Sequence, residues 1–236
     1  MSRRFFVRVP LRAGTMHLTG AEAHHLVRVL RIGVGQNVVL FDGGDFEAPA
    51  EVAAVTDGTV ELTVQELRAS CTESSVELVL ATAVPKGDRF GWLVEKATEL
   101  GVRTLVPLVT ERSIVNPGEG KLEKMRRTIV EASKQCRRSR LMELTEPMEW
   151  PEFLAHEPAG GPVWVAHPAG VAFDAAHVPA TGRIVAAVGP EGGFTEGEVE
   201  LAVGCGAGLV SLGPRVLRIE TAALALAAVI TGFRSS

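Results

Sequence analysis

Two glycine-rich turns, each placed directly after an apolar run, constrain this chain more than any other feature. Ile184–Val188 is followed by the turn Gly189–Gly193, and Leu209–Leu212 is followed by Gly213-Pro214. A further apolar segment begins near Ile219. The pattern predicts strand, loop, helix, strand, loop and helix, with both loops at the carboxyl ends of strands. Because ligands of open α/β sheets bind at that edge, the two loops predict one small-molecule site built largely from backbone.

The chain from residue 75 onwards alternates between strand-like and helix-like patterns. Thr195 and Glu198 have the spacing of a capping box, which marks a helix start. Trp92, Trp150 and Trp164 occupy apolar-patterned positions, and we assign them to the core. The alternation predicts an α/β fold, with a mostly parallel sheet and helices on both faces. The predicted strands are Val76–Val84, Val102–Val109 and Pro162–Ala166, and the predicted helices are Phe90–Leu100 and Lys121–Arg138.

The first seventy residues carry shorter strand-like runs and one helical pattern, as a small separate domain would. The helix is predicted over Thr19–Arg31, with Thr19 and Glu22 as a capping box and Gly33 just past its end. Asp57-Gly58 predicts a hairpin turn. The predicted strands are Phe5–Val9, Asn37–Asp42, Ala48–Val55 and Thr59–Leu67. We expect two domains, residues 1–70 and 75–236, joined by a polar linker.

Basic residues gather in two places although the net charge is -4. Six arginines stand against the single acid Glu22 between residues 1 and 36, and eight basic residues stand against two acids between residues 121 and 140. Such patches indicate a local contact with a polyanion such as RNA. Solvated helix faces explain the same charges equally well, and charge alone does not decide between the two.

Several functional classes lack their signatures. No apolar run reaches the roughly 18 residues of a membrane span, and no secretory signal pattern is present. The cysteines Cys71, Cys136 and Cys205 are isolated, so neither a zinc site nor a redox motif is indicated. The turn Gly189–Gly193 lacks the lysine of a phosphate-binding loop, and Glu191 would repel a phosphate. We therefore expect a cytoplasmic protein with no membrane segment and no metal.

The second turn continues as Leu212–Arg218, in which two arginines surround an apolar pair. Backbone amides at this turn could read the edge of a purine, with Leu212 and Leu217 covering its faces. An ordinary strand-to-helix turn is the alternative for both glycine-rich segments, and their residue types alone leave it open.

The segments GPEGGFTEGE and SLGPRVLRIETAALAL resemble motifs of the SPOUT superfamily of RNA methyltransferases. Within that superfamily, the chain is most similar to the bacterial 16S rRNA uridine N3-methyltransferases. AEAHHLVRVLR, PKGDRFGWLVEKATELGV and EASKQCRRSR agree in the same order. The resemblance therefore covers the chain from about Glu22 to Thr221.

The resemblance implies an α/β catalytic domain with a deep C-terminal trefoil knot, preceded by a PUA-like RNA-binding barrel. It also implies a homodimer that acts on 16S rRNA of the small ribosomal subunit. S-adenosylmethionine would be held by three loops, His167–Gly170, Gly189–Gly193 and Leu212–Arg218. The implied cofactor-binding residues are His167, Gly189, Pro190, Glu191, Gly192, Gly193, Leu212, Gly213, Val216, Leu217, Arg218 and Thr221.

Methylation at uridine N3 requires that the N3 proton leaves or that the resulting anion is stabilised. We assign this catalytic role to Arg218 through its charge, with Arg8, Arg137 or Arg138 as competitors. Glu191 is the second catalytic candidate, because a carboxylate is tolerable beside a cationic sulfonium. Methylation of a ribose 2'-oxygen or of guanine N1 on the same scaffold is one alternative, and a non-catalytic RNA-binding module is another. The candidates for RNA contact are Arg8, Arg28, Arg31, Lys86, Arg137 and Arg138.

Overall fold

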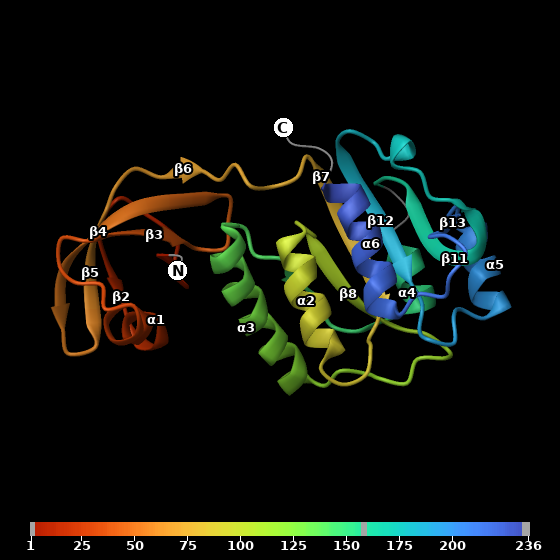
Figure 1. Ribbon diagram of the computed structural model, residues 1–236, viewed down its shortest axis with the longest axis horizontal. Coiled ribbons are helices and arrows are strands. Elements are labelled where there is room, and N and C mark those ends of the chain that lie inside the picture. The colour runs from red at the N-terminus through yellow and green to blue at the C-terminus, as the bar shows by residue number, and fades with distance from the viewer. Residues whose placement is uncertain (1–2, 157–159, 233–236) are drawn as a thin grey trace. The chain divides into compact units, whose positions relative to one another are not determined.

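The computed structural model describes residues 3–156 and 160–232. The chain divides into two compact units (Figure 1): unit 1 comprises Met1–Glu73 with Ser133–Leu141, and unit 2 comprises Ser74–Ala132 with Met142–Ser236. The first division lies near the expected linker. The return of Ser133–Leu141 to unit 1 was not predicted, and it means that helix α3 (Glu119–Cys136) contributes residues to both units.

Unit 2 contains, among its described residues, a seven-stranded sheet in which every pairing is parallel. Its order is β10-β8-β7-β12-β11-β13, and the short β9 pairs with β8. The two central strands are almost entirely apolar and buried, as strands covered on both faces must be. The strands are β7 (Val76–Ala83), β8 (Thr104–Val109), β9 (Glu143–Leu144), β10 (Met148–Glu149), β11 (Val163–Ala172), β12 (Gly182–Val188) and β13 (Gly208–Ser211).

Helices cover both faces of this sheet, as predicted (Figure 1). Helix α6 (Ile219–Thr231) packs on β7 and β12 and against α2 (Arg89–Glu99). On the other face, α4 (Trp150–His156) and α5 (Glu196–Gly204) join a core cluster with Val79 and Val185. A short 3₁₀ turn, η2 (Ala175–His177), lies between β11 and β12. No helix of the described chain is long and apolar enough to span a membrane.

The three tryptophans do not share one environment, contrary to the prediction. Trp150 is fully buried, and its ring centroid lies 4.6 Å from that of Phe194. Trp164 is half-buried. Trp92 is 49% exposed, because the buried stripe of α2 runs through Phe90, Leu93, Val94 and Ala97 and position 92 lies off that stripe.

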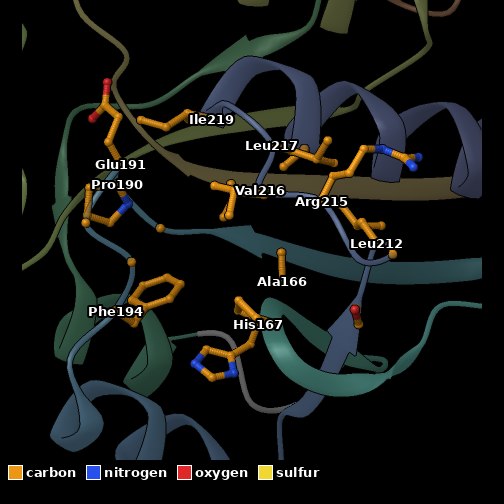
Figure 2. A pocket seen from close by; sticks show the side chains of 18 of the residues that line it. Ala166, His167, Pro190, Glu191, Phe194, Leu212, Arg215, Val216, Leu217 and Ile219 are labelled. Atoms are coloured by element: carbon orange, nitrogen blue, oxygen red, sulfur yellow. The ribbon is translucent and has the colours of Figure 1, made fainter.

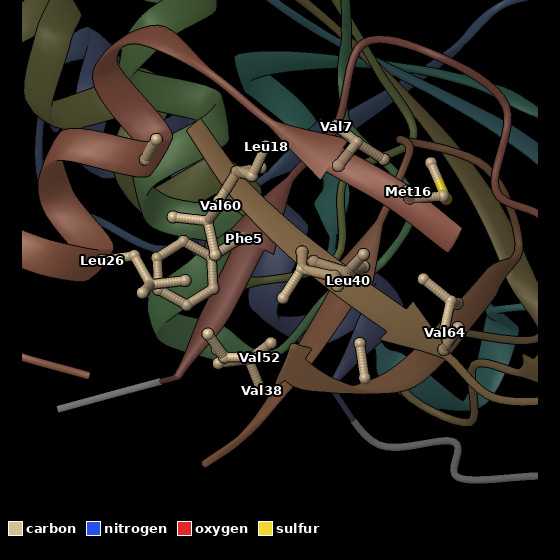
Figure 3. Close-up of a cluster of buried hydrophobic side chains, with 14 of the residues drawn as sticks. Phe5, Val7, Met16, Leu18, Leu26, Val38, Leu40, Val52, Val60 and Val64 are labelled. Carbon is tan, nitrogen blue, oxygen red and sulfur yellow. The ribbon is translucent and has the colours of Figure 1, made fainter. Parts of the chain in front are cut away.

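Unit 1 is built on a second sheet, with the order β1-β3-β4-β5-β2 and β6 paired to β4. Figure 3 shows the apolar side chains that pack between its strands and the helical segment. Asp57 and Gly58 have φ values of 38° and 82°, so the predicted hairpin turn is confirmed. The strands are β1 (Arg4–Phe6), β2 (Gly14–Leu18), β3 (Asn37–Phe41), β4 (Phe46–Thr56), β5 (Thr59–Val64) and β6 (Arg68–Ala69). β1 is shorter than predicted, and β2 was missed.

The helix predicted over Thr19–Arg31 is instead a short α-helix, α1 (Gly20–His24), that continues as a π-helix, η1 (His25–Val29). The predicted capping box is wrong, because the Thr19 side chain accepts no capping hydrogen bond and Glu22 pairs with Lys134. The helical segment ends at Val29, two residues before the predicted end at Arg31, and it is Arg31 and not Gly33 that takes a left-handed conformation there, with φ of 52°.

Buried ion pairs attach the segment Ser133–Leu141 to the rest of unit 1. The Arg138 guanidinium donates to both carboxylate oxygens of Glu73, at 3.0 and 2.8 Å, and its side chain is 3% exposed. Arg4 lies within 2.6 Å of Glu47, which also accepts from Ser139. Although burial opposes it, hydrogen bonds from Arg4 and Ser139 and the charges of Arg4 and Arg68 leave the pKa of Glu47 below its ordinary value. The burial of Arg138 argues against its predicted contact with RNA.

We predict that Arg138→Ala lowers the free energy of unfolding by about 3 kcal/mol, because it leaves the Glu73 carboxylate without its buried partner. Urea unfolding of the intact chain measures the loss. Arg137→Ala is the matched control: the neighbouring side chain is exposed, and a change within about 0.5 kcal/mol is expected. Equal unfolding midpoints for the two variants would contradict a structural role for Arg138.

Candidate functional site

A pocket of about 540 Å³ lies in unit 2 at the carboxyl ends of β12 and β13, beside the middle of β11 and the start of α6 (Figure 2). Three segments that are distant in sequence form it. They are residues 166–168, 188–194 and 211–217, joined by Arg112, Ile219 and Ala222. The site therefore lies at the sheet edge where the sequence placed it.

Two glycines of the loop Gly189–Gly193 occupy positions where a larger residue would clash or adopt a strained backbone. A Cβ atom on Gly189 would lie 2.9 Å from the Phe194 ring, and Gly193 has φ of 70°. The predicted capping box follows the loop: Glu198 N donates to Thr195 Oγ1 at 3.3 Å, and Thr195 N donates to Glu198 Oε2 at 2.8 Å. The loop is thus held close to the sheet and ends at a well-defined helix start.

The loop Leu212–Arg218 presents apolar side chains to the pocket. Gly213 has φ of 100°, which turns the chain after β13. Leu212 and Leu217 are half-buried and line the pocket. Val216 also lines it and is 96% exposed, so an apolar side chain stands uncovered beside the cavity. The arrangement suits a ligand with a flat apolar part.

The segment His167–Gly170 is not a loop after a strand, as was expected, but a bulge inside β11. The pairing of β11 with β13 shifts register between Ala166 and Val171. A Cβ atom on Gly170 would lie 2.5 Å from the backbone nitrogen of Val210, so the close approach of the two strands requires glycine. His167 lines the pocket, and its Nδ1 accepts a hydrogen bond from Ala169 N at 3.2 Å.

The structure brings most of the predicted cofactor residues together. His167, Gly189, Pro190, Glu191, Gly192, Gly193, Leu212, Gly213, Val216 and Leu217 all line the pocket. Arg218, the N-cap residue of α6, and Thr221 are exposed and do not line it. The Glu191 carboxylate lies 3.5 Å from the Arg89 guanidinium and points away from the other labelled side chains (Figure 2). Glu191 thus lines the pocket and pairs with Arg89, and its role beside a cationic ligand stays a prediction.

Arg112 is a pocket residue that sequence reasoning missed. Its Nη1 donates to the carbonyl of Gly192 at 2.8 Å, and the adjacent Glu111 N donates to Glu198 Oε1 at 2.9 Å. The segment follows β8 directly, so its place at the carboxyl edge of a strand was an available signal. Pro168, Pro214 and Arg215 line the pocket within the predicted loops, and the other lining residues missed are Ala166, Val188, Phe194, Ser211, Ile219 and Ala222.

The residues predicted to contact RNA are distributed over both units. Arg8, Arg28, Arg31 and Arg137 are exposed in unit 1. Lys86 is exposed in unit 2, in the turn that follows β7. The structure keeps these five side chains available to solvent.

Known proteins resemble this chain over most of its length. A model of the RNA methyltransferase domain matches residues 72–231, and a model of the RNA methyltransferase PUA domain matches residues 18–65. Ribosomal RNA small subunit methyltransferase E from Synechocystis is 36% identical over 88% of this chain and 70% of its own length. The protein of that name from Bacillus subtilis is 30% identical over 94% of this chain and 93% of its own length.

Solved structures agree with these relatives. Ribosomal RNA small subunit methyltransferase E from Neisseria gonorrhoeae, bound to S-adenosylmethionine, superimposes with a TM-score of 0.90 at 29% identity, over 99% of this chain and 98% of that one. A methyltransferase from Legionella pneumophila in complex with the same cofactor gives 0.86 at 30% identity, over 98% and 97%. The protein therefore belongs to the RNA methyltransferase family that includes ribosomal RNA small subunit methyltransferase E.

Proposed function

We propose that the protein transfers a methyl group from S-adenosylmethionine to N3 of a uridine in 16S ribosomal RNA of the small subunit. The observation that carries this proposal is the pocket itself. The loops Gly189–Gly193 and Leu212–Arg218, which carry the family motifs, meet the bulge of β11 in one cavity. Membership of the family of ribosomal RNA small subunit methyltransferase E supports the substrate.

The residues of the pocket fit this cofactor. Its volume of about 540 Å³ lies within the roughly 300–1,000 Å³ typical of small-molecule sites. Leu212, Val216 and Leu217 offer apolar surface to an adenine ring, and the glycines around them let backbone approach it. Arg112 and Arg215 place positive charge at the lining, where a ligand carboxylate is favoured.

When bound, S-adenosylmethionine supplies the methyl group of its sulfonium. The chain's own residues must orient the uracil and stabilise the negative charge left as the N3 proton departs. We assign the second task to Arg218, which directly follows the pocket residue Leu217 and is exposed at the first turn of α6. A guanidinium near the uracil oxygens stabilises that charge electrostatically.

The exposed arginines of unit 1 supply the proposed contact with RNA. Arg28 and Arg31 belong to the π-helix η1 and its end, and Arg8 and Arg137 are the other candidates in this unit. Lys86 is the candidate in unit 2. Cationic side chains that neutralise phosphates bind RNA without reading its sequence. The match of residues 18–65 to an RNA methyltransferase PUA domain supports this assignment.

We further propose a trefoil knot in the C-terminal segment. β13 lies at the edge of the sheet beyond β11, whereas the following α6 packs on the central strands β7 and β12, and this return supports a threaded route. The resemblance to the SPOUT superfamily supports a closed PUA-like barrel in residues 1–70, a methyltransferase domain in residues 75–236, a homodimer and a cytoplasmic location.

Methylation of 16S rRNA with isotope-labelled S-adenosylmethionine, followed by nucleoside mass mapping, tests the proposed reaction. We expect label in 3-methyluridine. Label in a 2'-O-methylated nucleoside or in 1-methylguanosine would instead identify one of the alternative methyltransferases. Absence of label in small subunits and naked rRNA alike would favour a non-catalytic RNA-binding protein.

Replacing Arg218 with alanine tests its assigned role. We expect single-turnover methylation to fall about 100-fold or more, as expected when one group that stabilises a developing charge is removed. The dissociation constant for S-adenosylmethionine should change by less than about threefold, because Arg218 does not line the pocket. An unchanged single-turnover rate would reject the assignment.

A further inference from the structure

Arg89, the first residue of α2, connects three segments around the proposed cofactor site. Its Nε donates to the carbonyl of Lys86 at 3.2 Å, in the turn after β7. Its Nη2 lies 3.5 Å from Glu191 Oε1, in the loop after β12. Its Nη1 lies 3.5 Å from Glu220 Oε1, in the first turn of α6. One guanidinium therefore pairs with two carboxylates from different loops.

The Glu220 carboxylate that pairs with Arg89 is buried. Glu220 is 6% exposed, and its Oε2 is buried without a hydrogen-bond partner in the part of the chain that the structure describes. A buried carboxylate is costly unless its charge is compensated. The start of α6 and the Arg89 guanidinium provide that compensation, because a helix N-terminus favours an anion. The anionic Glu220 thus holds Arg89 in place from the protein interior.

The other carboxylate of the pair belongs to the pocket loop. Glu191 stands between Pro190 and Gly192, both of which line the pocket, yet its own carboxylate turns toward Arg89. Glu220 likewise stands beside the lining residue Ile219. A displacement of Arg89 would therefore release the loop on one side of the cavity from the helix start on the other.

We propose that Arg89 is a positioning residue that couples the loop Gly189–Gly193 to the first turn of α6, through Glu191 and Glu220. The inference rests on the proposed function, because it concerns the same pocket. Glu191 then acts on the cofactor through Arg89 and through the shape of the loop, and not by direct contact with the sulfonium.

A double-mutant cycle on cofactor affinity tests this coupling. Isothermal titration with S-adenosylmethionine is compared for the intact chain, Arg89→Ala, Glu191→Gln and the double variant. We expect Glu191→Gln to raise the dissociation constant about threefold to fivefold, since the pair is partly exposed. Arg89→Ala should raise it about tenfold, and adding Glu191→Gln to it should change little further.

Two further variants keep the test decisive. Arg89→Lys retains the charge and should recover part of the affinity lost in Arg89→Ala. Arg127→Ala removes an exposed arginine of α3 outside the pocket lining and is the control, for which no change is expected. If Arg89→Ala fails to fold because Glu220 is left unpaired, the affinity of Glu191→Gln for S-adenosylmethionine tests the coupling by itself. This variant leaves the Arg89–Glu220 pair intact.

The coupling would be overturned if the dissociation constant of the double variant rose by the product of the two single effects, or if Glu191→Gln left the affinity unchanged. Either result would leave the proposed function in place. A fall in the melting temperature with unchanged affinity in Arg89→Ala would also overturn the coupling, because that pattern indicates a purely structural ion pair. Failure of the intact chain to bind S-adenosylmethionine would overturn the proposed function, and this inference with it.

Discussion

The parallel pairing of β7, β12, β11 and β13 determines where every loop of the pocket lies. Parallel strands bring their carboxyl ends to one edge of the sheet, so loops that are distant in sequence meet there without any contact specified locally. The pairing itself depends on burial, because β7 and β12 are apolar on both faces and need helices above and below. The irregular stretch of β11, in which Gly170 lies tightly against the backbone of Val210, also contains the lining residues His167 and Pro168.

Basic side chains make different contacts in the two units. In unit 1, Arg4, Lys134 and Arg138 are buried and paired with acids, so much of the basic character of Ser133–Leu141 serves cohesion within the unit. The arginines left exposed, among them Arg28 and Arg31, are the ones available to a polyanion. In unit 2, Arg89 and Arg112 contact two adjacent residues of the same short loop, at the Glu191 carboxylate and at the carbonyl of Gly192. Both arginines therefore help to fix the loop that borders the pocket.

Hydrophobic periodicity predicted the strands and helices whose buried faces are regular. It failed where contacts between residues distant in sequence determine the local structure. β7, β12, α2 and α6 were predicted because their burial leaves a regular apolar pattern. The burial of Arg138 could not be read from the sequence, because its partner Glu73 is 65 residues away. The π-helix η1 and the bulge in β11 depend on tertiary contacts that a pattern does not encode. Most pocket residues followed from the loops, whereas Arg112 required knowledge of which strand ends lie together.

Hydrogen–deuterium exchange of the intact chain, with and without S-adenosylmethionine, tests most directly whether these loops hold the cofactor. We expect slower exchange of backbone amides in residues 166–170, 189–194 and 212–217 when the cofactor is added. Exchange in unit 1 should change little, since the pocket lies within unit 2. Slower exchange confined to other segments, with these three unchanged, would contradict the central claim.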